Sequence, residues 1–173
     1  KTGVKTGETL AIFGLGGLGQ YAIQIAKLSG VRVIAVDVSE GKLATAKALG
    51  ADEVVVADEN AGAAIQAFGG AQGCVNFAPV GATWPLMLAA CNPRATIVLT
   101  AVPADKLAFY TYEVVERGLK VVGSSASNRQ EMNELLALAA RGSVKGMINT
   151  MPFEEINDAL TSLIEGRTEG RTV

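Results

Sequence analysis

Three glycines that follow a short apolar run are the first residues whose spacing points to chemistry. Gly14, Gly16 and Gly19 form the pattern G-x-G-x-x-G between the run Thr9–Phe13 and a stretch with helical periodicity. In that context the first glycine permits a tight turn, the second lets the backbone approach a pyrophosphate, and the third lets the helix pack closely on the strand. Free N–H groups at the start of the helix then attract phosphate charge. The pattern alone is a weak signal, but its place between a strand and a helix predicts a dinucleotide site.

An acidic residue ends the next predicted strand. The run Arg32–Asp37 is apolar between its two ends, and Asp37 can accept hydrogen bonds from both hydroxyls of an adenosine ribose. The same carboxylate repels the 2′-phosphate of NADP, and the next residue is Val38 rather than an arginine that would bind this phosphate. These residues therefore predict NAD rather than NADP as the cofactor. A helix N-cap aspartate beside a structural glycine turn is the alternative interpretation.

The chain lacks the residues that most often act as general bases and metal ligands. It contains no histidine among its 173 residues, and its two cysteines, Cys74 and Cys91, are too few and too far apart for a zinc motif. Both are expected to be ordinary buried thiols. No catalytic residue and no metal ligand is therefore predicted in this chain.

Short β-rich runs alternate with helical stretches along the chain. We expect strands at Thr9–Phe13, Arg32–Asp37, Glu53–Val56, Cys74–Phe77, Thr96–Thr100 and Lys120–Gly123, and the first helices at Leu18–Ser29, Glu40–Leu49, Ala61–Phe68 and Thr83–Cys91. Continuous apolar strands are typical of a parallel sheet that is covered on both faces. This order predicts an α/β fold, a doubly wound, mostly parallel, six-stranded Rossmann sheet with helices on both faces.

Two helices are expected to bury apolar stripes. The stripes are Leu18, Ala22, Ile25 and Ala26 in the first helix, and Phe153, Ile156, Leu160 and Leu163 in the last helix, which Pro152 opens. Between them, Asn128 and Glu131 form the pattern of a capping box at the start of another helix.

Composition and charge exclude several classes of function. The net charge is −2, the pI is near 5.2 and the basic residues are scattered singly, so we expect no nucleic-acid partner. No apolar run approaches the ~18 residues that a membrane span needs, and no signal-peptide pattern opens the chain. The expectation is a soluble cytoplasmic protein that forms one domain over residues 1–173.

A resemblance to a known family extends over essentially the whole chain. The coenzyme-binding domain of medium-chain, zinc-dependent alcohol dehydrogenases is similar to the stretch GETLAIFGLGGLGQYAIQIAKLSGVRVIAVDVSEGKLATAKALGADEVV. The run VVGSSASNRQEMNELLALAARG and the closing GRTEGRTV extend the likeness. The resemblance implies an NAD-binding domain of an oxidoreductase that transfers hydride between a small alcohol or aldehyde and NAD. It also implies that the zinc-bearing N-terminal catalytic domain is missing, so zinc is expected only there and the chain alone is expected to be inactive.

The resemblance assigns roles to individual residues of the adenosine and pyrophosphate half. The implied pyrophosphate turn consists of Gly14, Gly16, Gly17, Leu18 and Gly19. Arg171, in the closing G-R-x-V, is implied to reach the pyrophosphate, while Asp37 and Lys42 are implied to hold the adenosine ribose.

The residues that the resemblance implies for the nicotinamide half follow the later strands. Pro79 and Val80 would line the path between adenine and nicotinamide. Val102 would meet the nicotinamide, and the backbone around Ser124 and Ala126 would meet its carboxamide. The chain departs from the family pattern at Ala101, where a glycine is common, and the added methyl lies near the expected nicotinamide.

Three alternatives stay open at this point. A zinc-free reductase of the quinone oxidoreductase type shares the expected fold, but such enzymes usually prefer NADPH and lack an aspartate like Asp37. A methyltransferase-type domain that binds S-adenosylmethionine also has a glycine turn and an acidic residue, but it gives no reason for the EGRTV ending. A non-enzymatic NAD-sensing module would use the same domain as a binding switch.

Assembly is also implied by the resemblance, because family members pair edge strands across a two-fold axis. The apolar segment Met147–Thr150 is the candidate edge strand for a homo-oligomer.

Overall fold

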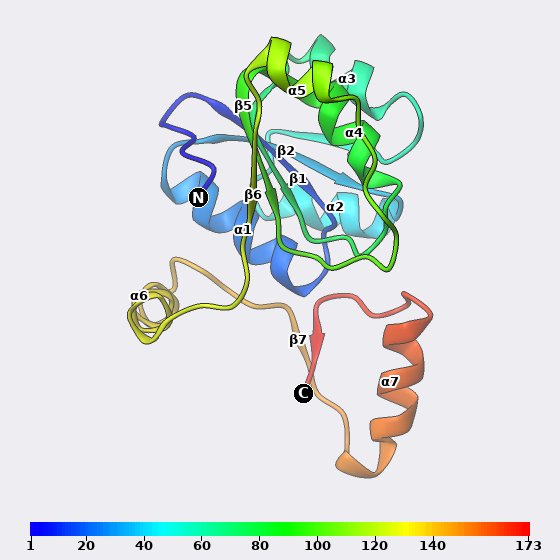
Figure 1. Cartoon of the computed structure of the whole chain (residues 1–173). Helices are drawn as coiled ribbons and strands as arrows, with labels where there is room; N and C mark the ends of the chain where they lie inside the picture. Colours follow the sequence, from blue (N-terminus) through cyan, green and yellow to red (C-terminus); the bar gives the residue numbers. More distant parts are fainter.

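Six parallel strands form the main sheet of the computed structural model, which describes residues 1–173 (Figure 1). They are β1 (Thr9–Phe13), β2 (Arg32–Asp37), β3 (Glu53–Val56), β4 (Ala71–Asn76), β5 (Cys91–Leu99) and β6 (Lys120–Gly123). Their order across the sheet is β3-β2-β1-β4-β5-β6, and every neighbouring pair is parallel. The chain therefore winds outward in one direction from β1 and in the other from β4. This topology confirms the predicted doubly wound sheet.

Apolar residues on both sides of the central strands bury the sheet between two helical layers. The helices α1 (Gly17–Leu28) and α2 (Glu40–Ala48) cover one face, and α3 (Ala61–Ala67), α4 (Thr83–Ala90) and α5 (Thr111–Arg117) cover the other. Successive side chains of a strand point to opposite faces. Accordingly Leu10 and Ile12 of β1 belong to the core beneath α1 and α2, whereas Ala11 and Phe13 belong to the core beneath α3 and α4. No helix is both long and apolar enough to cross a membrane.

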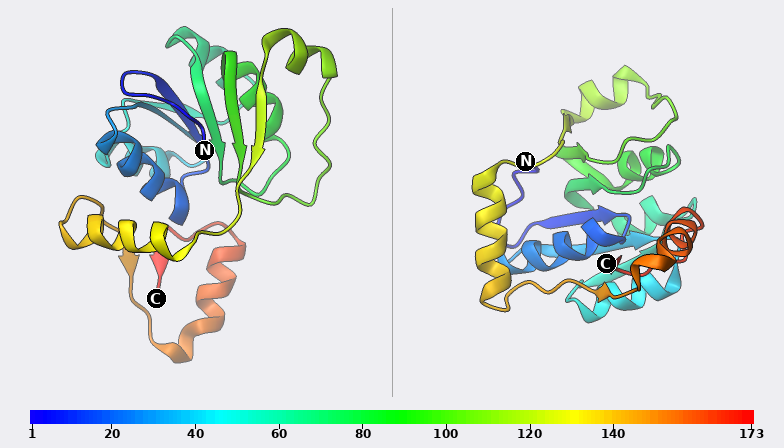
Figure 2. Two further views of the ribbon diagram at one scale, coloured as in Figure 1. Left: turned by 60° about the vertical axis from the view of Figure 1, so that its left-hand side comes forward. Right: turned by 90° about the horizontal axis from the view of Figure 1, so that it is seen from below.

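The chain leaves the six-stranded sheet after β6 (Figure 2). Helix α6 (Arg129–Ala140) begins at Asn128, whose side chain accepts from Glu131 N–H while the Glu131 side chain accepts from Asn128 N–H, so the predicted capping box is confirmed. A separate two-stranded parallel sheet consists of β7 (Ile148–Asn149) and β8 (Arg171–Thr172). Between these strands lie the 3-10 turn η1 (Phe153–Glu155) and helix α7 (Ile156–Ile164).

The predicted apolar stripe of α1 is confirmed only in part, and that of the last helix is wrong. In α1, Ala26 is buried and Ala22 packs against the core, but Leu18 is 51% and Ile25 39% exposed and Ile23 is buried in their place. The stripe of the last helix is also exposed, with Phe153 80%, Ile156 45%, Leu160 50% and Leu163 54% accessible. Within this chain that stripe faces only residues near β8, across an open cavity of about 180 Å³.

The predicted edge strand Met147–Thr150 contains β7. Its hydrogen-bonded neighbour is β8 of the same chain, with Ile148 opposite Arg171 and Asn149 opposite Thr172. The segment therefore does not extend the six-stranded sheet, and its pairing with a second copy stays a prediction.

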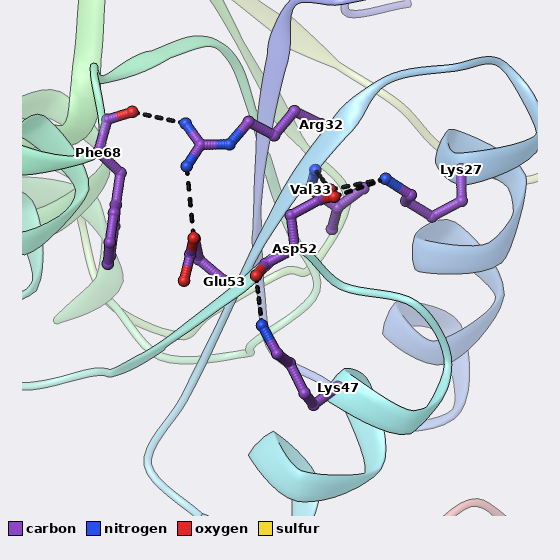
Figure 3. Close-up of polar contacts among 7 residues, drawn as sticks. All are labelled: Lys27, Arg32, Val33, Lys47, Asp52, Glu53 and Phe68. Atoms are coloured by element: carbon purple, nitrogen blue, oxygen red, sulfur yellow. Dashed lines mark hydrogen bonds and ion pairs between the residues drawn. The ribbon is translucent and has the colours of Figure 1, made fainter.

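Asp52, in the G-A-D sequence, joins both helices of one face to the strands beneath them (Figure 3). Its carboxylate accepts from Lys27 of α1, at 2.8 and 2.7 Å, and from Val33 N–H of β2, at 2.7 Å. Lys47 of α2 donates to the backbone oxygen of Asp52. Partial burial raises the pKa of the carboxyl, but these hydrogen bonds and nearby positive charges outweigh burial and hold the pKa below 3.8. The network ties α1 and α2 to the amino ends of β2 and β3.

Candidate cofactor-binding site

A tight glycine turn connects the end of β1 to the start of α1. Gly14 has a φ of +88°, which L side chains rarely adopt, and a Cβ there would lie 2.6 Å from the backbone nitrogen of Ala78. Gly19 lies so close to the turn that a Cβ would overlap the carbonyl oxygen of Gly14. Both positions therefore require glycine for the packing of the protein itself.

Gly16 differs from these two glycines, because nothing fills the space where its side chain would be. It is the N-cap of α1 with a φ of −70°, and an added Cβ would meet no heavy atom within 4 Å. The first turn of α1 carries no acidic side chain. The first N–H groups of a helix lack intrahelical partners and carry partial positive charge. The turn therefore leaves an open cradle in which an anion can approach the backbone.

Arg171 reaches the same turn from β8. Its guanidinium and Cδ occupy the space that a Cβ of Gly17 would need, so the arginine lies directly against the first residue of α1. The side chain stays exposed, and its charge lies beside the cradle at Gly16. The structure thus brings together residues from the glycine turn, α1 and β8 that could hold a phosphate from two sides.

Asp37 lies at the carboxyl end of β2 and is 8% exposed. Its Oδ2 accepts from Leu15 N–H in the glycine turn at 2.8 Å, and its Oδ1 accepts from Ser39 N–H at 3.0 Å. These two bonds fix the carboxylate between the turn and the start of α2. Each ionised oxygen retains further acceptor capacity, so the carboxylate can also accept from ribose hydroxyls. The neighbouring Val38 is exposed and offers no positive charge for a 2′-phosphate.

Lys42 is placed close to Asp37 by the first turn of α2. Its N–H donates to Oγ of the N-cap residue Ser39 at 3.4 Å, and the residue is partly exposed. Glu169 lies nearby, since a Cβ on Gly41 would be 2.7 Å from its Oε1. The segment that leads into β8 therefore extends from α2 to the glycine turn.

The remaining predicted residues follow the later strands of the sheet. Pro79 and Val80 come after β4, Val102 after β5, and Ser124 and Ala126 after β6. All six strands are parallel, so these residues gather at the same edge as the glycine turn and Asp37. A cavity of about 500 Å³ between the loops is lined by residues that include Ala101, Val102 and Ser124. This edge is where open α/β sheets bind their ligands.

Sequence reasoning did not identify the residues that attach the last segment to α1. Gln20 and Gln24 hydrogen-bond the backbone at Met147 and Lys145, at 2.8 to 3.0 Å. Two glutamines four positions apart share one face of a helix, but this spacing does not indicate what they bind. Nowhere does the chain group three or more His, Cys, Asp or Glu side chains that could hold a metal ion.

Comparison with known proteins identifies relatives over the whole chain. Residues 17–141 match the family described as zinc-binding dehydrogenase. An alcohol dehydrogenase of Geobacillus stearothermophilus is 36% identical over 174 residues, which covers 99% of this chain and 52% of that protein. This chain therefore spans about half the length of that relative.

Solved structures give the same picture. The alcohol dehydrogenase of the hyperthermophilic archaeon Aeropyrum pernix superposes with a TM-score of 0.93 at 31% identity, over 98% of this chain and 50% of that one. The acetophenone reductase of Geotrichum candidum, solved in complex with NAD, superposes with a TM-score of 0.86 at 25% identity, over 99% of this chain and 49% of that one. Because the family match covers most of its length, the chain belongs to the zinc-binding dehydrogenase family.

Proposed function

We propose that this chain binds NAD(H) as the coenzyme-binding part of an oxidoreductase that transfers hydride between a small alcohol or aldehyde and NAD. One observation supports this above the others. The buried carboxylate of Asp37 is hydrogen-bonded to Leu15 of the glycine turn, so a ribose-binding group and an open phosphate cradle form one continuous site.

The chemistry of the chain's own residues supports this proposal. The open space at Gly16 and the guanidinium of Arg171 suit a pyrophosphate, while Asp37 and Lys42 suit the adenosine ribose. Pro79 and Val80 would line the path toward the nicotinamide. The residues after β5 and β6, namely Val102, Ser124 and Ala126, would meet the nicotinamide and its carboxamide.

We propose that this chain binds and orients the cofactor, and that hydride transfer takes place at its surface. The nicotinamide ring accepts or donates the hydride when bound. The start of α1 and Arg171 would hold the pyrophosphate of the cofactor, and the residues after β5 and β6 would bind its nicotinamide end. We propose that zinc, which the family's description implies, belongs to a catalytic domain outside residues 1–173. The chain by itself should then bind NAD and catalyse no reaction.

Calorimetric titration of NAD, NADP and S-adenosylmethionine against the chain tests this proposal. NAD should bind tightest, because Asp37 repels a 2′-phosphate and Val38 cannot pair with one. The variant Asp37→Gly with Val38→Arg should weaken NAD about 10- to 100-fold, since charged hydrogen bonds to the ribose are lost, and it should strengthen NADP.

Asp58→Gly is the matched control. Asp58 follows β3 as Asp37 ends β2, it is exposed, and its carboxylate accepts a single hydrogen bond, from Asn60 N–H at 2.8 Å. It should leave NAD affinity unchanged. Unchanged NAD affinity in the double variant, or tighter binding of S-adenosylmethionine than of NAD by the unmodified chain, would overturn the proposed function.

A further inference from the structure

One face of α1 is directed at the C-terminal segment instead of the sheet. Its members are Gly17, Gln20, Tyr21 and Gln24, which follow the i, i+3, i+4, i+7 spacing of a single helical stripe. Three of them touch three successive residues, numbers 145 to 147, which follow α6 and lead into β7. Figure 2 shows this segment passing along α1.

The two glutamines bind backbone groups of that segment. Gln24 accepts from Lys145 N–H at 2.9 Å through Oε1 and donates to the Lys145 carbonyl at 2.8 Å through Nε2. Gln20 accepts from Met147 N–H at 3.0 Å through Oε1. Between them, Gly146 lies against the hydroxyl of Tyr21, where a Cβ would not fit. The segment is therefore fixed in register along the helix.

A backbone hydrogen bond connects Met147 to Arg171. Its carbonyl accepts from Arg171 N–H at 2.8 Å, which sets the start of β8. Gly170, with a φ of +74°, packs so closely on the same carbonyl that a Cβ would overlap it. Arg171 follows Gly170, and its guanidinium lies against Gly17. Hydrogen bonds thus connect Gln20 to Arg171 through a single residue, Met147.

Gln20 occupies a position where an apolar side chain would be expected. The residue is 2% exposed, and its Nε2 has no hydrogen-bond partner. A buried amide donor without a partner lowers stability, so packing against the sheet does not explain a glutamine here. Its one satisfied bond, to Met147 N–H, is the contact that leads to Arg171.

We propose that Gln20 and Gln24 are positioning residues of the dinucleotide site. They hold residues 145–147 on α1 so that Arg171 stays over the glycine turn and its guanidinium meets the pyrophosphate of the cofactor. The inference rests on the proposed function, because it takes the anion at this turn to be the pyrophosphate of NAD.

The test compares Gln20→Leu, Gln24→Leu and Arg171→Ala in the full chain, by calorimetry with NAD and with adenosine, which has no phosphate. Each variant should weaken NAD about 10-fold, the effect of one charged hydrogen bond lost or misplaced, and leave adenosine affinity unchanged. Gln20→Leu combined with Arg171→Ala should bind NAD no more weakly than Arg171→Ala alone, because the glutamine acts through the arginine. Amide exchange at Met147 and Arg171 should accelerate in both glutamine variants.

Gln66→Leu is the matched control. Gln66 donates to the carbonyls of Ala89, Ala90 and Cys91 at 3.1 to 3.2 Å, so its replacement also removes glutamine bonds to backbone, but on the other face of the sheet. It should lower stability without changing NAD affinity.

Three outcomes would overturn the inference. They are additive losses in the combined variant, a loss of adenosine affinity equal to that of NAD, and unchanged NAD affinity in both single glutamine variants. Gln24 is only partly buried, so its variant gives the answer even where Gln20→Leu does not fold. A chain that binds adenosine but not NAD before any substitution overturns the proposed function itself, and the positioning role with it.

Discussion

Replacing Gly16 by alanine tests the open cradle without disturbing the fold. The added methyl enters space with no heavy atom within 4 Å, at a residue whose φ is −70°. Alanine is a poorer N-cap than glycine by less than about 1 kcal/mol, but it also lowers the entropy of the unfolded chain, which stabilises by about 0.4–1 kcal/mol. The two effects offset each other. We therefore expect the midpoint of thermal unfolding to move by less than about 4 °C.

Binding should respond very differently to the same methyl. It occupies the place proposed for a pyrophosphate oxygen, so the cofactor must withdraw from the N–H groups at the start of α1. The loss of one charged hydrogen bond costs about 1.5–3 kcal/mol, which raises the Kd for NAD about 10- to 100-fold. Calorimetry with NAD measures this change, and adenosine, which carries no phosphate, should bind both proteins equally.

Two results would refute this reasoning. Wild-type affinity for NAD in Gly16→Ala would show that the pyrophosphate does not lie against the turn. A large fall in the unfolding midpoint would show that the space at Gly16 is not open.

Three further predictions concern the scaffold. Gly19→Ala should destabilise the chain by about 1–3 kcal/mol, because the new Cβ overlaps the carbonyl oxygen of Gly14 and backbone must shift; a wild-type urea midpoint would contradict this. Asp52→Asn should lower the free energy of unfolding by about 1 kcal/mol above about pH 5. That difference should shrink as the pH falls through 3.8 to the lower pKa of the folded state, because protonation removes the stabilising charge from the wild type; urea titrations that show a pH-independent difference would disprove it. The contact with Cys91 and burial raise the pKa of the Cys74 thiol, and burial leaves Cys74 0% and Cys91 1% exposed. Iodoacetamide should therefore modify both cysteines only as fast as the chain unfolds, and rapid labelling of the native protein, seen by mass spectrometry, would refute that.

The strands are the elements that the sequence predicts best, because a buried parallel strand is a continuous apolar run. β1 and β2 match their expected bounds for this reason. β4 begins at Ala71, earlier than expected, since Gln72 and Gly73 interrupt the apolar signal. Helix α5 was not predicted, because its two valines, Val114 and Val115, are adjacent and show no helical period.

The glycine turn and Asp37 are predictable because their roles require particular residue types. A positive φ at Gly14 and a carboxylate at the end of β2 both leave a mark in the sequence. The partners of Gln20 and Gln24 leave no such mark, because the glutamines bind backbone groups, which every residue possesses. Gln20 is polar yet buried, so the apolar residues of α1 do not indicate its burial.

Because Arg171 lies against Gly17, the proposed phosphate site depends on both ends of the chain. Every strand of the six-stranded sheet precedes Arg171 in the chain, while the turn it contacts follows the first strand. During synthesis, which proceeds from the N-terminus, the sheet, the turn and Asp37 can form before β8 exists. A chain interrupted after α6 would still present Asp37 but would lack Arg171. If Arg171 binds the pyrophosphate as proposed, affinity for the charged middle of a dinucleotide should therefore depend on the segment after α6 returning to the first helix.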